Sequence, residues 1–483
     1  MKRILLIFLS ISICLYSFAA GIKSGPWTTQ ARPDGVTILW TSETPGMAWV
    51  ELSDGTKVWE TFAGRHVFHR LHSIRIKKLT PGTVLKYRIC GQDLADDSNA
   101  RDPKFGEIYQ GEWHNVRSFN PKAPECRFSV FNDIHMRTDE YSSLASQVDS
   151  ASTDFLFLNG DIVSAGNYDL DTYTQYTLDP LGKLPAGLPV FFARGNHEGR
   201  GNNVELMADV FPSGGPAPFY YTFRQGPVAF IVLDAGETGK ERSVLYSGKK
   251  IYEEYLNEQM NWAKRAMREP SFSTAPVKVC ILHVPMTDHE DKDDYYLQCW
   301  MNANFLPVLN KAGIDLMIGA DLHEFMFCDK GTMNNDFPII VNNEIDRLDF
   351  TYSNGQITLK SFHPDGTKHF ERSFTPQSEF NLNPNKSMYD VTLISDTTEN
   401  GIRKTSFQTC PAVCSVQIDI ETEGNIIRKV KFTRGCHGNT QGVAKLCEGM
   451  KIDDVISRLE GIDCNSRGTS CPDQLARALR QLK

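Results

Sequence analysis

The sequence has no excess of basic residues. It carries 51 lysines and arginines against 59 aspartates and glutamates over 483 residues, which gives a formal net charge of −8. No global positive field is therefore available to attract nucleic acid or an anionic membrane surface, and an anionic substrate has to be attracted locally. After the first 20 residues there is also no apolar run long enough to span a membrane. Internal repeats and long low-complexity tracts are absent as well.

Cysteine is too sparse for a disulfide framework that staples the whole chain. The composition is that of an ordinary globular protein, 41% hydrophobic with twelve cysteines, which can bury a sizeable core without such cross-links. Half of the cysteines lie after residue 400 and form a separate cluster, namely Cys410, Cys414, Cys436, Cys447, Cys464 and Cys471.

The first 20 residues, MKRILLIFLSISICLYSFAA, have the layout of a secretory signal. Lys2 and Arg3 form a basic start, an apolar run follows to residue 18, and small residues end the segment. We interpret residues 1–20 as a cleaved signal peptide and expect export to the periplasm or out of the cell.

Three changes of pattern divide the rest of the chain into domains. Residues 21–120 contain short alternating strands such as VTILW, separated by turns such as RPDG, which predicts a β-sandwich of the fibronectin-III-like type. Residues 124–374 contain fully apolar short strands such as DFLFL and VAFIVL between amphipathic stretches, which indicates a layered α/β domain. Residues 375–388 are typical of a linker. Residues 389–483 predict a small, cysteine-rich α+β domain with three short helices.

Polar residues follow five of the apolar strands of the α/β domain, at the point where each strand ends. Because the carboxyl ends of such strands meet at one edge of an open sheet, these residues are expected to share a site. Carboxylates, an amide oxygen and imidazoles without thiolates suit Mn, Fe, Zn or Co. An aspartate alone at its strand end can bridge two ions about 3.5–4 Å apart, and such a pair clamps a phosphoryl oxygen and generates hydroxide near neutral pH. The residues are Asp133, His135, Asp161, Asn196, His197, His283, Asp321 and His323.

The motifs DIH, NGD, GNHE, LHVP and ADLH, in this order, resemble those of the calcineurin-like metallophosphoesterases. The resemblance implies His197 as a proton donor to the leaving oxygen or as a stabiliser of the transferring phosphoryl group. It also implies that Glu198 orients His197. One metal ion would be held by Asp133, His135, Asp161 and His323, and a second by Asp161, Asn196, His283 and Asp321.

Two departures from the resemblance bear on the metal chemistry. The last family motif is Gly-His-x-His, whereas this chain has Asp321 at the first histidine position. The added carboxylate should weaken water activation and favour harder metals such as Mn or Mg over Zn. Two interpretations follow, an active enzyme with an altered metal preference and a protein with a weak second metal site. The stretch RPDGVTILWTSE resembles the front domain of purple acid phosphatases, but Ser164 stands where their iron-binding tyrosine would follow Asp161.

The C-terminal region carries the string TSCPD. Pro472 is predicted to begin a helix with Cys471 as its N-cap, where the helix dipole favours a thiolate. Residues 389–483 resemble the small domain named after this string, which occurs alone and at the C-terminus of adenosylcobalamin-dependent ribonucleotide reductases and is thought to bind zinc. The chain has no room for the ten-stranded radical barrel that reductase activity requires. The candidate zinc or redox ligands are Cys414, Cys436, Cys464 and Cys471, with disulfides as the alternative.

The sequence as a whole predicts an exported, metal-dependent phosphoric ester hydrolase. It would use two divalent or trivalent ions of Mn, Fe or Zn to hydrolyse a phosphomonoester or phosphodiester on a small molecule or a surface, and its C-terminal domain would hold a structural zinc. One alternative is a non-catalytic protein that binds phosphate or a partner through a site decayed at Asp321. Another is a nucleotide-linked or redox role of the C-terminal domain, whose relatives work in the cytosol. The acidic run 288–294, DHEDKDD, is interpreted as a solvated loop rather than a cation site.

Overall fold

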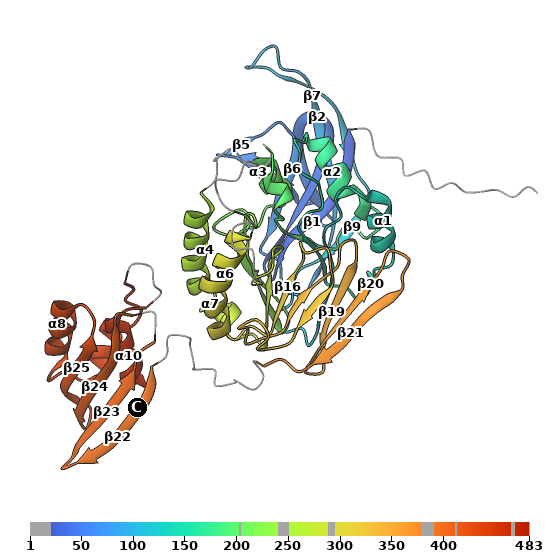
Figure 1. Ribbon diagram of the computed structural model, residues 1–483. Helices are drawn as coiled ribbons and strands as arrows, with labels where there is room; N and C mark the ends of the chain where they lie inside the picture. Colours follow the sequence, from blue (N-terminus) through green and yellow to red (C-terminus); the bar gives the residue numbers. More distant parts are fainter. Residues whose placement is uncertain are drawn as a thin grey trace, which may run out of the picture.

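The computed structural model describes residues 21–201, 204–239, 251–287, 295–377, 391–410, 413–464 and 469–482. The predicted signal peptide, most of the predicted linker and the acidic run all lie outside these residues. No helix of the described residues is long and apolar enough to cross a membrane. Figure 1 shows a front β region, a central layered region and a C-terminal sheet with helices, in chain order.

The front region is built around one long strand, β2 (Gly35–Leu52), whose sequence bursts VTILW and AWVEL form a single element. Its first half pairs with two strands and its second half with two others, so it connects both parts of the sheet. Val36, Ile38 and Trp40 alternate along it and are fully buried. The predicted β-rich front region is confirmed, and its fibronectin-III-like type stays a prediction. The other strands of the sheet are β1 (Ile22–Arg32), β3 (Lys57–Trp59), β6 (His69–Lys77), β7 (Val84–Asp96), β8 (Lys104–Gln110) and β9 (His114–Arg117), and β4 (Thr61–Phe62) pairs with β5 (Arg65–His66).

The central region contains two six-stranded sheets that pack face to face around one core. The apolar runs of the sequence form its strands, and several of them are buried at every position because both faces of each sheet are covered. The first sheet has the order β12 (Val190–Ala193), β11 (Phe155–Asn159), β10 (Cys126–Phe131), β19 (Arg347–Ser353), β20 (Gln356–Phe362), β21 (Lys368–Phe374). The second has the order β13 (Tyr221–Gln225), β14 (Val228–Val232), β15 (Val277–Ile281), β16 (Leu316–Gly319), β18 (Ile339–Val341), β17 (Met326–Cys328).

Helices cover the outer face of each sheet, each layer with its own hydrophobic cluster. Figure 1 shows α4, α6 and α7 on one side of the sheets and α1 and α2 on the other. This arrangement confirms the layered α/β domain. The first set comprises α4 (Tyr252–Ala266), α5 (Pro270–Ser273), α6 (Tyr296–Asn304) and α7 (Leu306–Ala312), and the second α1 (Thr138–Ser146), α2 (Leu170–Thr177) and α3 (Val204–Val210).

The front region packs directly on the strand that leads to Asn196. Thr28 of β1 forms an isolated bridge with Pro189, next to β12. The hydroxyl of the following residue, Thr29, donates to the carbonyl of Val190 at 2.7 Å. Both regions contribute residues to the core between the two central sheets. The front region therefore supports the base of one metal-site loop.

The C-terminal region has its own sheet and core. Four antiparallel strands are covered by helices, and the apolar side chains of both form one cluster. The three predicted short helices are present. The elements are β22 (Thr392–Glu399), β23 (Ile402–Gln408), β24 (Ser415–Glu423), β25 (Ile426–Arg434), α8 (His437–Cys447), α9 (Ile452–Leu459) and α10 (Cys471–Arg480).

Candidate metal centre

Five of the predicted site residues share an uncommon backbone conformation. They lie immediately after buried strands and have positive φ angles, a region in which residues other than glycine are strained by roughly 1–3 kcal/mol each. All five lie in loops that follow β10, β11 and β16. These residues are Asp133 (50°), His135 (47°), Asp161 (53°), Asp321 (67°) and His323 (55°).

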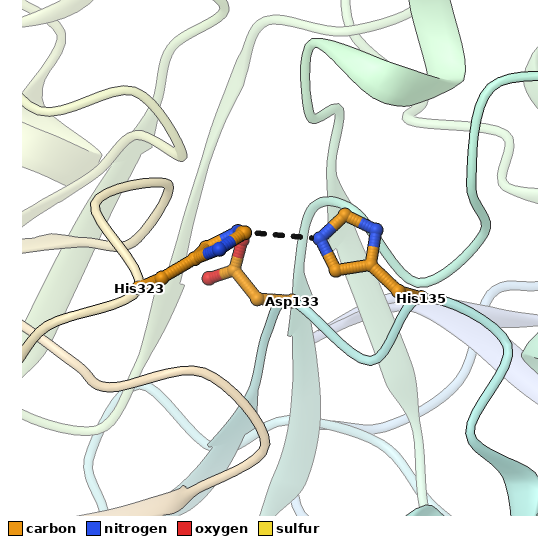
Figure 2. Close-up of side chains that lie close together, drawn as sticks. All are labelled: Asp133, His135 and His323. Atoms are coloured by element: carbon orange, nitrogen blue, oxygen red, sulfur yellow. Dashed lines mark hydrogen bonds and ion pairs between the residues drawn. The ribbon is translucent and has the colours of Figure 1, made fainter.

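Asp133, His135 and His323 form the first cluster (Figure 2). The Nε2 atoms of His135 and His323 lie 3.3 Å apart, and Nε2 of His323 lies 3.5 Å from Oδ1 of Asp133. The nearby carboxylate of Asp133 raises the pKa of His323, whereas burial lowers the pKa of His135. Two imidazole nitrogens and a buried carboxylate oxygen thus converge from the ends of two different strands.

Asp161 connects this cluster to a second one, formed with Asp133 and His283. Its two oxygens point to different partners, because Oδ1 lies 3.4 Å from Nε2 of His283 and Oδ2 lies 3.9 Å from Nε2 of His135. Burial opposes ionisation of Asp161, but the charges and hydrogen bonds of His283 and His197 together outweigh it and lower the pKa of Asp161. The position of Asp161 between two ligand clusters fits a bridging ligand.

His283 is oriented by the backbone of a neighbouring strand. Its Nδ1 lies 2.6 Å from the carbonyl oxygen of Asn159, which accepts a hydrogen bond from it and leaves Nε2 directed at the carboxylates. A backbone carbonyl in this position fixes the ring tautomer in the way that is typical of metal-binding histidines. Burial lowers the pKa of His283, but Asp161 and Asp133 raise it to well above its usual value.

The donor set fits a bound cation. Within this donor set, three buried atoms have no hydrogen-bond partner among the described residues, namely Oδ1 of Asp133, Oδ1 of Asn196 and Nε2 of His283. Burying a polar group unpaired costs about 1–3 kcal/mol, so three around one point indicate a ligand. Asn196 is oriented by its own amide nitrogen, which donates to Oε1 of Glu237 at 3.2 Å.

Asp321 lies at the edge of this set. Its backbone amide donates to Oδ2 of Asp133 at 3.2 Å, and its Oδ1 lies 3.9 Å from Nε2 of His283. Burial raises the pKa of Asp321 to about 7, against the opposing charge of His283. A cation beside this third carboxylate would therefore favour its ionised form.

His197 lies beside the clusters and is held by an arginine. Nη1 of Arg200 lies 2.9 Å from Nε2 of His197, and because a guanidinium can only donate, Nε2 accepts and the neutral ring carries its proton on Nδ1. Burial lowers the pKa of His197, and the charge of Arg200 lowers it further. Arg200 also pairs with Glu237 at 2.9 Å.

Glu198 does not orient His197, contrary to the prediction. Its carboxyl group accepts backbone hydrogen bonds from Gly195 and Asp161 at 2.9 Å and from Ile162 at 2.8 Å. A fourth amide, that of Val163, donates at 3.4 Å, and four converging N–H groups bind a carboxyl group more strongly than one imidazole. Glu198 therefore joins the loop after β12 to the loop after β11. Glycine is needed where these loops meet, because a Cβ on Gly195 would lie 2.1 Å from Oδ1 of Asp161.

Glu237 is the site residue that the sequence did not indicate. It follows β14, carries no motif, and contacts both Asn196 and Arg200. Only the general rule that strand ends gather polar residues could have found it.

In the C-terminal region the four predicted cysteines line one cavity of about 420 Å³. No disulfide joins the described cysteines. The predicted N-cap was wrong: Ser470 caps α10 through its Oγ, which accepts from the amide of Asp473 at 3.1 Å, and Cys471 is the first helical residue. A hydroxyl accepts hydrogen bonds better than a thiol, which explains the shift by one residue.

The fold and the site define a layered α/β domain of the dinuclear metal-binding type. Residues 126–325 match the model of the calcineurin-like phosphoesterase family, and residues 389–483 match that of the TSCPD domain. The chain thus carries a calcineurin-like phosphoesterase domain followed by a TSCPD domain. The curated proteins contain no match.

Among solved structures, the purple acid phosphatase PPD1 from yellow lupin (Lupinus luteus) seeds matches with a TM-score of 0.55 and 12% identity, over 74% of this chain and 75% of its own. This similarity is one of fold. A putative 5′-nucleotidase from Staphylococcus aureus (13% identity, TM-score 0.30) covers 57% of this chain and 61% of its own. A cold-active protein-tyrosine phosphatase from a Shewanella species (13%, 0.24) covers 72% and 98%. The last two scores are too low to carry a structural argument.

Proposed function

We propose that this chain is an exported hydrolase that cleaves a phosphomonoester or phosphodiester with two bound metal ions. The observation that carries the proposal is the set of buried, unpaired ligand atoms of Asp133, Asn196 and His283 around Asp161. Oxygen and imidazole donors of this kind suit Mn, Fe or Zn.

The proposed ligand sets are those that the family resemblance implies, and the two clusters support part of each. Asp133, His135 and His323 would hold one ion, Asn196, His283 and Asp321 the other, and Asp161 both. When bound, such a pair supplies a hydroxide near neutral pH and neutralises charge on the phosphoryl group. The surrounding residues keep the donors in place: Glu198 fixes two loops, Asn159 fixes the tautomer of His283, and Glu237 orients Asn196.

His197 and Arg200 would act together on the substrate. Donation of a proton from Nε2 of His197 requires Arg200 to leave that nitrogen first. Stabilisation of the phosphoryl oxygens by the guanidinium, with His197 holding it in position, requires no such movement. The contact between the two side chains favours the second role.

The test is metal analysis of the purified protein together with turnover of an aryl phosphate monoester and an aryl phosphate diester. Asp161→Asn should reduce the metal content and remove most of the activity. His197→Ala should leave the metal content unchanged and lower turnover, by roughly 10²–10⁴-fold if its Nε2 donates a proton. A wild type that holds no metal and stays inactive after addition of Mn or Zn would instead support a binding protein with a decayed site.

Export rests on the first 20 residues alone. Sequencing the N-terminus of protein recovered from the periplasm or medium should give Gly21 as the first residue. Recovery of the chain in the cytoplasm with Met1 retained would contradict export and leave the hydrolase proposal untouched.

A zinc ion in the C-terminal cavity is a second proposal. It is supported by the four cysteines, Cys414, Cys436, Cys464 and Cys471, that line this cavity. Serine at all four positions should lower the zinc content of the full chain by one equivalent, without altering phosphoesterase activity. Unchanged zinc content would contradict this assignment.

A further inference from the structure

A second group of potential metal ligands lies outside all five sequence motifs. Asp346 precedes β19, His363 follows β20, and His369 lies in β21, three strands that Figure 1 shows side by side. One ligand atom from each residue lies within 4.8 Å of the other two. The chain thus brings two imidazoles and a carboxylate together from three neighbouring strands.

A β-bulge places His369 in this group. Ser361 of β20 pairs with Phe370 of β21, but the next residue, Phe362, pairs with Lys368, so His369 is an extra residue without a partner in the ladder. Such bulges redirect side chains and are common on edge strands next to functional sites. β21 is the edge strand of its sheet.

The carboxylate of Asp346 lies next to the Nδ1 atom of each ring. Its Oδ1 is 2.8 Å from Nδ1 of His363, and its Oδ2 is 3.4 Å from Nδ1 of His369. The rings themselves stack, with centroids 4.5 Å apart and planes inclined by 19°. Both Nδ1 atoms therefore face the same carboxylate.

Asp346 is a buried anion without a permanent counter-charge. It is 1% exposed, its Oδ2 has no hydrogen-bond partner, and within the described part of the chain no lysine or arginine pairs with it. The adjacent Arg347 turns away and pairs with Asp349 at 2.9 Å. A cation beside it, either a protonated histidine or a metal ion, would stabilise such a buried carboxylate.

The surroundings hold the two histidines in place. The turn after His363 is tied to α1, because Ser143 and Gln147 both donate to the carbonyl oxygen of Pro364, at 2.9 and 2.8 Å. The ring of Phe325 packs edge-on against His369 with centroids 5.0 Å apart. Rigid donors require little rearrangement to receive an ion.

We propose that Asp346, His363 and His369 bind a metal ion of their own, a borderline divalent cation such as Zn²⁺ or Co²⁺. Two imidazole nitrogens, one carboxylate oxygen and a water molecule complete a tetrahedral set, for which neighbouring donors stand about 3.3–3.5 Å apart. The distances of 2.8 and 3.4 Å involve different oxygens of Asp346, so the carboxylate has to turn until one oxygen faces both nitrogens. The ion joins the hairpin of β20 and β21 to β19 and is independent of the phosphoesterase proposal.

The test counts Zn²⁺ bound to the chelator-treated full chain after equilibration at micromolar free metal. The double variant His363→Gln/His369→Gln should bind one equivalent less than the wild type. The matched control His66→Gln/His69→Gln, which removes two exposed histidines of the front region, should bind as many as the wild type. Zn²⁺ bound at other sites contributes equally to the wild type and the variants, so it cancels when their metal contents are subtracted.

Two further measurements make the result decisive. The loss of one equivalent should persist when Asp161→Asn is present in both proteins, which separates this site from the two-metal site. Asp346→Asn, which keeps the shape of the side chain, should lower the affinity for this one Zn²⁺ ion roughly 10–100-fold or more. Equal Zn²⁺ content in the wild type, the double variant and Asp346→Asn, all folded by circular dichroism, overturns the proposal and leaves a hydrogen-bonded Asp–His group.

Discussion

Gly195 is the position at which a single methyl group should separate the two metal-site loops. In Gly195→Ala the new Cβ would lie 2.1 Å from Oδ1 of Asp161, 2.4 Å from its amide nitrogen and 2.6 Å from Oε2 of Glu198. An ordinary van der Waals contact needs about 3.4 Å, so Asp161 or Gly195 has to move by roughly 1 Å. None of these neighbours is the free end of an exposed side chain, because Asp161 and Glu198 are both buried.

The size of the effect follows from this displacement. Overpacking a buried site costs about 1–3 kcal/mol, and a displacement of about 1 Å at a catalytic group lowers turnover by roughly 10²-fold. We therefore expect a lower midpoint of denaturant unfolding, weaker metal retention and activity reduced by about two orders of magnitude. The change acts on the shared ligand, so both ions should be affected.

The assay is denaturant unfolding followed by metal analysis and aryl phosphate turnover. The matched control is Gly106→Ala, where the nearest atom to the new Cβ is a carbonyl oxygen at 3.8 Å; it should behave as the wild type. If Gly195→Ala also keeps wild-type stability, metal content and activity, the contact between the two loops does not position Asp161, and the argument from close approach fails.

Three other changes test single residues. Arg200→Gln removes a positive charge that lowers the pKa of His197, so this pKa should rise in an NMR titration of the chelator-treated protein; an unchanged value would show that burial acts alone. Asp321→His removes a negative charge from the second ligand set, so the acidic limb of the rate–pH profile should move down and Zn²⁺ should compete better with Mn²⁺. Asp321→Ala should loosen one ion only, and identical behaviour of wild type and both variants would mean that Asp321 is not a ligand. Ser470→Ala should destabilise the C-terminal region by about 0.5–2 kcal/mol through loss of its helix cap, as measured by thermal unfolding; no change would contradict the capping bond.

The layered core and the meeting of the strand ends could be predicted, because both depend on local patterns. A run such as FLFLN is apolar at every position but the last, and it forms a strand buried on both faces that delivers Asp161 at its end. Parallel neighbours then bring other strand ends to the same edge. The sequence did not predict that the apolar segments VTILW and AWVEL belong to one strand. They do so because the residues between them stay extended, while the two halves of the strand pair with different neighbours.

The contacts that orient the site could not be read from the sequence. Glu198 was expected to orient the side chain of His197, but it accepts from four backbone amides that only the folded loops bring together. Glu237 and Asp346 belong to no sequence motif. The order of the strands in the sheet brings Glu237 to its partners, and the bulge in β21 brings His369 to Asp346. Such interactions depend on how the chain folds in three dimensions, and the spacing of residues along the sequence does not reveal them.

The shared core of the front and central regions has a consequence for how the protein unfolds. The guanidinium of Arg32 lies over the rings of Phe191 and Phe223, 5.6 and 5.4 Å from their centroids, and Phe119 stacks on Phe191. Separating the two regions would expose this aromatic layer to water, so we expect them to melt as one cooperative unit. The C-terminal sheet encloses a cluster of its own. Calorimetry should therefore resolve two transitions, and removal of residues 389–483 should abolish one of them while the other keeps its midpoint.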